Sequence, residues 1–320
     1  MTGNGHSAII KRVKELTGRR IDGRPQIWED TSQYMGICGG MIIRLAGTDY
    51  YVTGEANEGR FGIEEQPKFW VKYAVDLNSG SKKVLKLVFR EEIESARIGP
   101  HRVRGSRSAA KEARVLDMVR GHPNFMQGVS FADAAGNLVR VVDFVRGPSI
   151  YSYLRNLDTD HRTYFFETLP SIMRSLLEAF DAISFLREHA EQHGDIRNDH
   201  ILIDPETGKY VWIDFDYEMS NPDYDIWCLG NVLTCVVGKG NHYFNEIQKN
   251  PAAYPPNAET DSLCSADSLF LFKHRVADLR KLFPYIPEKL GRILLRFSSG
   301  TPLFYDSVRS LIDDLGEVYP

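Results

Sequence analysis

The sequence predicts an α+β protein built in two parts: a strand-rich N-terminal half that carries one helix, and a helix-rich C-terminal half. Short apolar or alternating runs, which are typical of strands, fill residues 41–144, and a helical stripe interrupts them at 108–119. After Gly147-Pro148 the pattern changes to long stripes at helical spacing, the first of them over 170–189. With 320 residues, the chain has the length of about two domains.

The N-terminal half is expected to begin with a short helix over 7–16, where apolar residues recur every three or four positions. The runs expected to form strands after it are short and apolar or alternating: MIIRL, YYV, FWVKYAVDL, KKVLKLVF and NLVRVVDFV. The tetrapeptide NSGS predicts a hairpin turn between the third and fourth of these runs.

The C-terminal half is expected to contain a long amphipathic helix over 170–189, followed by two short strands, HILID and YVWID, joined by PETGK. Residues 226–237 are nearly all apolar, which predicts a helix buried on most sides. Residues 238–268 are rich in Asn, Pro, Ser and Ala and are expected to form a long loop or insertion. The final helices are expected over 269–283, 288–297 and 305–315.

The composition is that of a soluble, folded protein and argues against several functional classes. Against 39 Lys and Arg the chain has 43 Asp and Glu, a net charge of −4, so neither nucleic acid nor a membrane surface is expected as its main partner. No apolar run reaches the roughly 18 residues of a membrane span. The four cysteines are far apart and lack CxxC spacing, and we expect free thiols in a cytoplasmic protein. The oligomeric state is left open.

The clearest chemical pattern is the hydrophilic octet from His193 to His200, which lies just before HILID. Asp195 precedes the predicted hairpin and Asp214 closes it. A hairpin returns the chain to its starting end, so the two carboxylates can lie close enough for one to bind a metal ion while the other orients a hydroxyl. The spacing alone favours the alternative, two solvated acids at strand ends.

These residues also carry a family resemblance. HGDxxxxH, with IDFD closing the hairpin, resembles the catalytic loop and DFG segment of the protein-kinase-like superfamily, in its eukaryotic Ser/Thr type. Further matches keep the family's order: Lys86 in a hairpin strand, Glu112 in the helix AAKEARVLDMV, VVDFVRGPS as a hinge, and DIWCLG as DxWxxG. The resemblance covers about residues 48–315. It implies a bilobal fold, with an antiparallel N-lobe sheet, one N-lobe helix, a mostly helical C-lobe, and ATP and Mg²⁺ between the lobes.

In that fold, residues 1–47 would be an N-terminal extension, 48–145 the N-lobe and 146–320 the C-lobe, with an insertion at about 238–268.

The resemblance also implies catalytic roles. Lys86, fixed by Glu112, would hold the nucleotide phosphates, and Asp214 would hold Mg²⁺. Asp195 would take the proton of the acceptor hydroxyl, and Arg197 would face a phosphate. A plain surface ion pair is the alternative for Lys86 and Glu112, but Lys86 lies inside an apolar strand, where an unpaired ammonium would be costly.

For the nucleotide, the resemblance points to the hinge and to a glycine-rich loop. Val142, Asp143 and Val145 would meet the adenine, with Val142 as the gatekeeper. Gly59 and Gly62 belong to NEGRFG, which resembles a phosphate-binding GxGxFG with its first glycine replaced. A glycine-rich hairpin without a ligand is the alternative.

Several residues depart from the family pattern. His200 stands where the family has a metal-binding asparagine, and it could ligate a metal, donate to a phosphate or support the loop. Asp216 replaces the glycine of DFG. Gly194 replaces the arginine that normally meets a loop phosphate, so switching by phosphorylation is not expected. Only ten residues separate Asp214 from Asp225, which leaves no peptide-docking segment of the usual kind.

The resulting hypothesis is an ATP- and Mg²⁺-dependent phosphotransferase that acts on a hydroxyl of a protein or of a small molecule. The missing docking segment and HGD favour a small molecule, whereas DxWxxG favours the protein-kinase branch. The alternative is a pseudokinase, a nucleotide-binding or empty scaffold that acts through partners; His200, Asp216 and the incomplete glycine loop favour it.

A run of basic residues precedes and enters the predicted helix at 108–119, and it is either a solvated face or a patch that binds an acidic effector. Its members are Arg97, His101, Arg102, Arg104, Arg107, Lys111 and Arg114.

Overall fold

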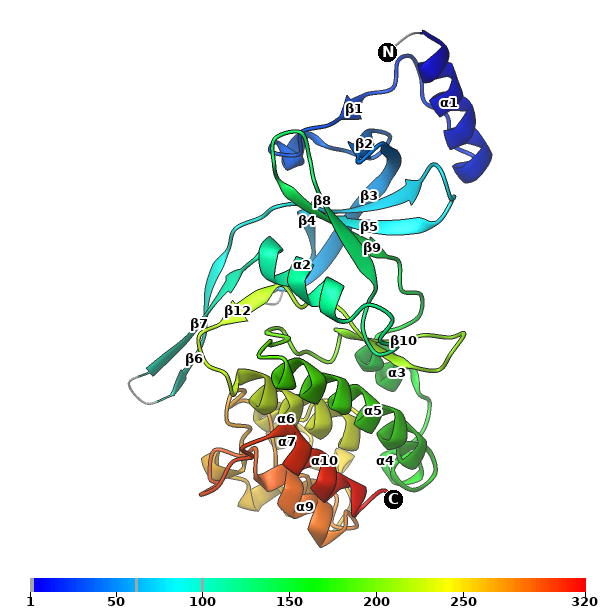
Figure 1. Cartoon of the computed structure of the whole chain (residues 1–320). Helices are drawn as coiled ribbons and strands as arrows, with labels where there is room; N and C mark the ends of the chain where they lie inside the picture. The colour runs from blue at the N-terminus through cyan, green and yellow to red at the C-terminus, as the bar shows by residue number, and fades with distance from the viewer. Residues whose placement is uncertain (1–2, 61–62, 99–100) are drawn as a thin grey trace. The chain divides into compact units, whose positions relative to one another are not determined.

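The computed structural model describes residues 3–60, 63–98 and 101–320, and the chain is a mixed α+β protein (Figure 1). Its contacts divide it into two compact units. Unit 1 comprises residues 1–91, 107–122 and 126–144, and unit 2 comprises residues 92–106, 123–125 and 145–320.

Unit 1 is built on a seven-stranded sheet in the order β1-β2-β3-β4-β5-β9-β8. Its strands are β1 (Ile27–Trp28), β2 (Ile42–Leu45), β3 (Thr48–Arg60), β4 (Ile63–Asp76), β5 (Lys82–Lys86), β8 (Gly128–Ala132) and β9 (Leu138–Asp143). Its helices are α1 (Gly3–Thr17) and α2 (Ala109–Met118). Strands β1 and β2 run parallel, and every other pair in this order is antiparallel. The strands and helices predicted for the N-terminal half are confirmed.

The N-terminal segment completes unit 1 in two ways. Strands β1 and β2 extend the sheet, and Ile37 together with the ring of Trp28 packs on the buried face around Val52 and Leu85. Helix α1 buries Val13 against β2, β3 and the turn after β4. This burial removes from water apolar surface of the sheet that would otherwise be exposed.

Unit 2 is mostly helical. Its helices are α3 (Ile150–Asn156), α4 (His161–Thr163), α5 (Leu169–Glu188), α6 (Tyr224–Val237), α7 (Phe244–Lys249), α8 (Leu279–Leu282), α9 (Glu288–Leu295) and α10 (Val308–Gly316). Its strands are β6 (Glu92–Ile98), β7 (His101–Arg107), β10 (Ile201–Ile203), β11 (Tyr210–Trp212) and β12 (Tyr217–Met219). Helix α5 packs against α10 and β11, and α6 is buried on nearly all sides, as its apolar sequence predicts.

A three-stranded sheet in unit 2 has the order β12-β7-β6. The hairpin of β6 and β7 interrupts unit 1 in the sequence, since it follows β5 and leads directly into α2. The amide of Ser220 donates to the carbonyl of Arg104 at 2.8 Å, and Ser95 bonds the hydroxyl of Tyr224. The short segment after Asp214 is thereby paired with a hairpin that the sequence did not predict.

Two expectations for the C-terminal half are corrected. The helix predicted over 269–283 is wrong except for α8, because the amides of Phe270 and Val276 donate to the distant carbonyls of Phe297 and His242 instead of to a helical turn. Residues 238–268 are not a plain loop, since they contain α7 and three short 3₁₀ turns.

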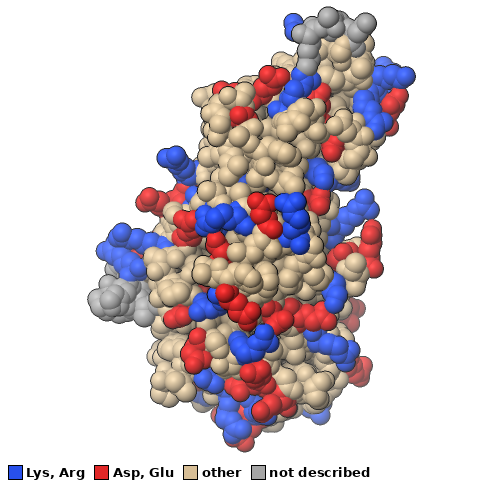
Figure 2. Space-filling model, in the orientation of Figure 1, with Lys and Arg blue, Asp and Glu red and all other residues tan. Residues whose placement is uncertain are grey.

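None of the described helices has both the length and the apolar character needed to span a lipid bilayer. On the face drawn in Figure 2, basic and acidic side chains are interspersed, so neither sign of charge dominates this surface.

Candidate functional site

Three buried charged residues meet in unit 1. Lys86 at the end of β5 binds one carboxylate oxygen of Glu112, which lies in the first turns of α2. Arg140 of β9 donates from Nε to the other oxygen at 3.0 Å. The exposed fraction is 0% for Glu112 and 2% for Arg140, so this is a buried ion cluster and not a surface pair.

The local sequence explains this arrangement. Lys86 and Arg140 are directly opposite on the neighbouring strands β5 and β9, so both side chains point to one face of the sheet. Ser108 caps α2 by accepting a hydrogen bond from the amide of Lys111, and the N-terminal end of a helix favours a carboxylate such as Glu112. Sequence reasoning missed Arg140, although an arginine in the middle of the apolar strand LVRVVD was a usable signal.

The residues predicted to bind the nucleotide base lie at the end of β9. Val142 is buried opposite Val84, and Asp143 forms an ion pair with Lys83. Val145 is half-buried and is assigned to unit 2. For the glycine-rich loop, the backbone of Gly59 belongs to β3, whereas Gly62 lies outside the described residues.

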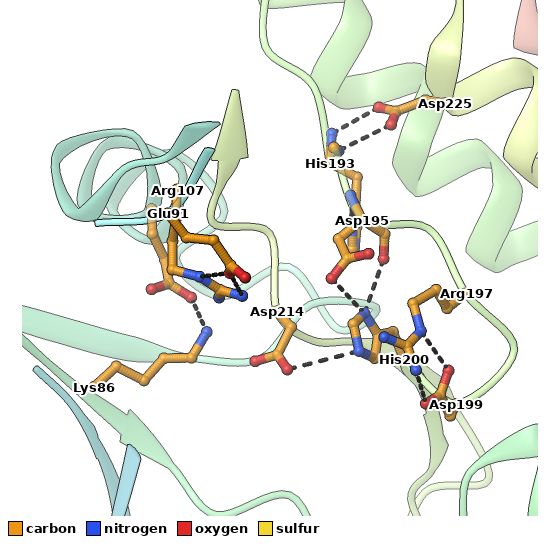
Figure 3. A network of polar contacts seen from close by, with 12 residues as sticks. Lys86, Glu91, Arg107, His193, Asp195, Arg197, Asp199, His200, Asp214 and Asp225 are labelled. Atoms are coloured by element: carbon orange, nitrogen blue, oxygen red, sulfur yellow. Dashed lines mark hydrogen bonds and ion pairs between the residues drawn. The ribbon is translucent and has the colours of Figure 1, made fainter. Parts of the chain in front are cut away.

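The loop from His193 to His200 in unit 2 is fixed by buried hydrogen bonds. The Asp225 carboxylate, fully buried at the start of α6, accepts from the amides of His193 at 2.7 Å and of Gly194 at 2.8 Å (Figure 3). The amide of Asp195 donates to Nδ1 of His193, whose ring packs edge-on against Phe215. These contacts hold the backbone that carries Asp195, and bonds to an ionised acceptor are the stronger kind.

Gly194 is required by this geometry. Its φ is +83°, in the region that favours glycine, and a Cβ would stand 2.0 Å from the carbonyl oxygen of Tyr217. The chain after Asp214 therefore runs directly against the HGD turn. A larger residue at position 194 would displace one of the two segments.

His200 lies between the two candidate carboxylates (Figure 3). The β10–β11 hairpin produces this neighbourhood, since the amide of Ile213 donates to the carbonyl of His200 at 3.0 Å. Nδ1 of His200 is 2.8 Å from the main-chain oxygen of Asp195 and 3.6 Å from its carboxylate. Nε2 is 3.7 Å from Oδ2 of Asp214.

Asp214 has an unusual backbone. Its φ is +61°, which is rare for a residue with a side chain and costs of order 1 kcal/mol or more. The next residue, Phe215, is fully buried with its ring edge-on to Phe125, and Asp216 is also buried. Buried neighbours on its C-terminal side therefore hold Asp214 in a strained conformation, a feature that is enriched at functional sites.

The charges of the loop shift the acidity of Asp195. Burial raises the pKa of its carboxyl, and the nearby carboxylates of Asp216 and Asp214 raise it further. The charges of His200 and Arg197 lower it, but the pKa remains above its ordinary value. A raised pKa makes a carboxylate a better proton acceptor near neutral pH.

Arg197 is held by a residue that sequence reasoning did not single out. Asp199 accepts from Nε and from an Nη atom of Arg197 at 2.9 and 2.6 Å. This two-pronged contact sets the orientation of the guanidinium. The side chain of Arg197 is still about one third exposed, so an anion can reach it.

Several described members of the basic run are paired with acids or buried. Arg102 pairs with Glu94 at 3.1 Å and Arg107 with Glu91 at 3.2 Å, whereas Lys111 is buried. The side chains of Arg97 and His101 lie outside the described residues.

No protein-family model matches the chain, and no curated protein matches it either. What the protein does is therefore inferred from its own residues.

Proposed function

We propose that the chain is an ATP-dependent phosphotransferase, which moves the γ-phosphoryl group of ATP to a hydroxyl of a protein or of a small molecule. The observation that carries the proposal is the buried His193–His200 loop of unit 2. Its backbone is fixed by Asp225, and the β10–β11 hairpin that follows the loop returns Asp214 to it, so that the carboxylates of Asp195 and Asp214 lie on either side of His200. Two carboxylates in different surroundings can take different roles, one as a base and one as a metal ligand.

In this proposal Asp195 accepts the proton of the acceptor hydroxyl. The freed oxygen forms a bond to the γ-phosphorus while the bond from that phosphorus to the bridging oxygen breaks, and ADP leaves with the electron pair. Lys86 holds the nucleotide phosphates, and Arg197, oriented by Asp199, faces a phosphate oxygen. The hydroxyl can belong to a serine or threonine or to a small molecule.

The donor atoms present fit one divalent cation that is completed by other ligands. Asp214 offers a carboxylate and His200 offers an imidazole nitrogen that makes no hydrogen bond to the described residues. Within the described part of the chain, no three His, Cys, Asp or Glu side chains converge on one point, so nucleotide phosphates and water would supply the other ligands. A bound cation, Mg²⁺ in the first instance, neutralises charge on the phosphate oxygens.

A nucleotide-binding scaffold without catalysis is the second candidate. The observation that favours it is the histidine at position 200, because imidazole is a poorer ligand for Mg²⁺ than oxygen is. The buried pair of Lys86 and Glu112, which matches the pattern of the resembled family, favours the phosphotransferase over the scaffold.

A thermal-shift titration separates these candidates. ATP at about 100 times its Kd should stabilise a binding-competent protein by about 2.7 kcal/mol, and the phosphotransferase should need a divalent cation for the full shift. A shift that is independent of metal supports the scaffold, and no shift under either condition contradicts nucleotide binding altogether. Incubation with labelled ATP, a cell extract and a metabolite pool then identifies the acceptor.

A further inference from the structure

A cavity in unit 2 is lined by none of the residues to which the proposed function gives a role. Its volume is about 490 Å³, within the range usual for sites that bind small molecules. The lining comes from the start of α4 and from two later segments of the chain, 253–257 and 283–285. Aromatic rings and prolines make up much of it: Tyr254, Pro255, Phe283, Pro284 and Tyr285. A wall of this kind suits a flat, apolar group.

Two histidines hold the tyrosines of this wall in place. Nε2 of His161 and Nε2 of His242 lie 3.0 and 2.8 Å from carbonyl oxygens at the C-terminal end of α6, and a carbonyl oxygen only accepts hydrogen bonds. Burial lowers the pKa of both rings, so they are neutral at pH 7 and Nδ1 accepts in each. The hydroxyl of Tyr285 donates to the first at 2.7 Å and that of Tyr254 to the second at 2.9 Å. The wall is therefore ordered before a ligand arrives, which reduces the entropy cost of binding.

One cation lies at the same cavity. The guanidinium of Arg162 is 5.1 Å from the ring centroid of Tyr285 and 5.3 Å from that of Phe166. Contacts with aromatic rings engage the flat face of a guanidinium and leave the N–H groups at its edge available. Among the residues that the structure describes, no carboxylate forms an ion pair with Arg162. The fork of N–H groups fits a ligand carboxylate, which it can bind through two parallel hydrogen bonds.

Asp160 limits the charge that such a ligand can carry. Its carboxylate accepts from the hydroxyl of Thr163 at 2.7 Å and from the amides of Thr163 and Arg162 at 3.1 and 2.9 Å. The hydrogen bonds from Thr163 lower the pKa of Asp160, so this lining residue is negatively charged at neutral pH. Arg162 can compensate one negative charge on a ligand, whereas a dianion such as a phosphate monoester would also be repelled by Asp160.

We propose that this cavity binds a small aromatic monocarboxylate. The ring of the ligand lies against Tyr254, Phe283 and Tyr285, and its carboxylate accepts hydrogen bonds from Arg162. The inference goes beyond the proposed function and does not depend on it, because it adds a second ligand site built from other residues.

The test uses the full chain and three probes that share one ring system: 2-naphthoate, the uncharged 2-naphthamide and the dianionic 2-naphthyl phosphate. Isothermal titration calorimetry with each probe at up to about 5 mM covers the affinities expected for ligands of this size. The Kd of 2-naphthoate for the wild type should be at least about tenfold lower than that of 2-naphthamide. Arg162→Met, a change at an exposed position, should raise the Kd of 2-naphthoate about tenfold and leave that of 2-naphthamide nearly unchanged.

The control is Arg155→Met. Arg155 is also exposed and also lies over a tyrosine ring, that of Tyr151, but it does not line the cavity, so its loss should leave the Kd of 2-naphthoate unchanged. Equal weakening in the two variants would overturn the proposal.

Two results with the wild type alone would also overturn it: no binding of 2-naphthoate, or equal affinity for 2-naphthoate and 2-naphthamide. Neither result requires a variant to fold. If 2-naphthyl phosphate binds as tightly as 2-naphthoate and loses that affinity in Arg162→Met, the assignment of a monocarboxylate is wrong.

Discussion

Arg140 donates a hydrogen bond to Glu112 at 3.0 Å while Lys86 binds the other oxygen of the same buried carboxylate. Removing one partner from a buried ion pair is costly, because the remaining charge is left uncompensated away from water. With Arg140 in place, Glu112 would stay paired if the ammonium of Lys86 turned toward a phosphate, as the proposed function requires. We therefore regard Arg140 as the residue that positions Glu112.

The first prediction concerns this cluster. Arg140→Met should lower the free energy of unfolding by about 3 kcal/mol and weaken ATP binding. Arg140→Lys should lower the free energy of unfolding by a smaller amount, because the lysine keeps the positive charge although it lacks the planar guanidinium. Urea unfolding and an ATP titration measure the two effects. Arg120→Met is the control, since Arg120 forms an exposed pair with Asp117 and its loss should change stability by under about 1 kcal/mol. Equal effects at the two positions would contradict the positioning role.

The second prediction concerns the HGD turn. Gly194→Ala should destabilise the protein by more than about 2 kcal/mol and abolish activity, because the new Cβ would collide with the carbonyl of Tyr217 in addition to straining the backbone. Gly208→Ala is a matched control: Gly208 also has a positive φ, +70°, but has open space around it, so only the backbone cost of about 1–2 kcal/mol is expected. Thermal unfolding of the two variants measures the difference in their stability. A similar loss of stability in both would mean that the structure relaxes around the new Cβ at position 194, which would contradict the prediction.

The third prediction is a dependence of stability on pH that comes from His161. Its Nε2 is 3.0 Å from the carbonyl of Val237 and its Nδ1 is 2.7 Å from the hydroxyl of Tyr285, so the neutral ring donates to the first and accepts from the second. Burial lowers the pKa of His161 to about 4; a hydrogen bond to Val237 and the charge of Asp160 oppose the shift, and the charges of His242 and Lys239 add to it.

Because the folded pKa lies below the ordinary value of 6.5, the unfolded chain takes up a proton first as the pH falls. The stability contribution of neutral His161 is therefore complete above pH 6.5 and is lost between about pH 6.5 and 4, by up to about 3 kcal/mol. The glutamine of His161→Gln can both donate and accept a hydrogen bond but does not titrate, so the melting temperature of this variant should change less between pH 7 and pH 5 than that of the wild type. The control His189→Gln, at an exposed histidine, should keep the pH dependence of the wild type. If His161→Gln also keeps it, His161 is not the cause of that dependence.

Some parts of the fold could be read directly from the sequence. The nearly all-apolar run of α6 and the stripe of α5 carry strong periodic signals, and both helices occur as predicted. The hairpin of β6 and β7 could not be recognised in the same way, because its polar residues fall on both faces and only Val103 is buried among its described side chains at 92–96 and 102–106. The Gly99-Pro100 pair was its one turn signal.

The error at 269–283 has a different cause. An apolar run predicts burial more reliably than it predicts a helix, and Val276 and Ala277 are indeed fully buried. Their segment is nevertheless extended, since its amides bond to distant carbonyls such as that of His242.

For the candidate site, the residue types and their order could be read from the sequence, but the partners could not. The spacing of Asp195 and Asp214 around a hairpin predicted that they could lie close, but not that His200 would lie between them. Arg140 and Asp199 were missed because each acts through another residue, Glu112 or Arg197, and such a contact depends on strand register or loop shape.

In the proposed function, this chain transfers the γ-phosphoryl group of ATP with Asp195 as the base. The most direct measurement is transfer of labelled γ-phosphate from ATP to acceptors in a cell extract and metabolite pool, comparing the wild type with Asp195→Ala in the presence of Mg²⁺ or Mn²⁺. We expect labelled product from the wild type and a rate of transfer that is about 100-fold or more lower in Asp195→Ala, with ATP binding retained. Equal transfer by both proteins would contradict it.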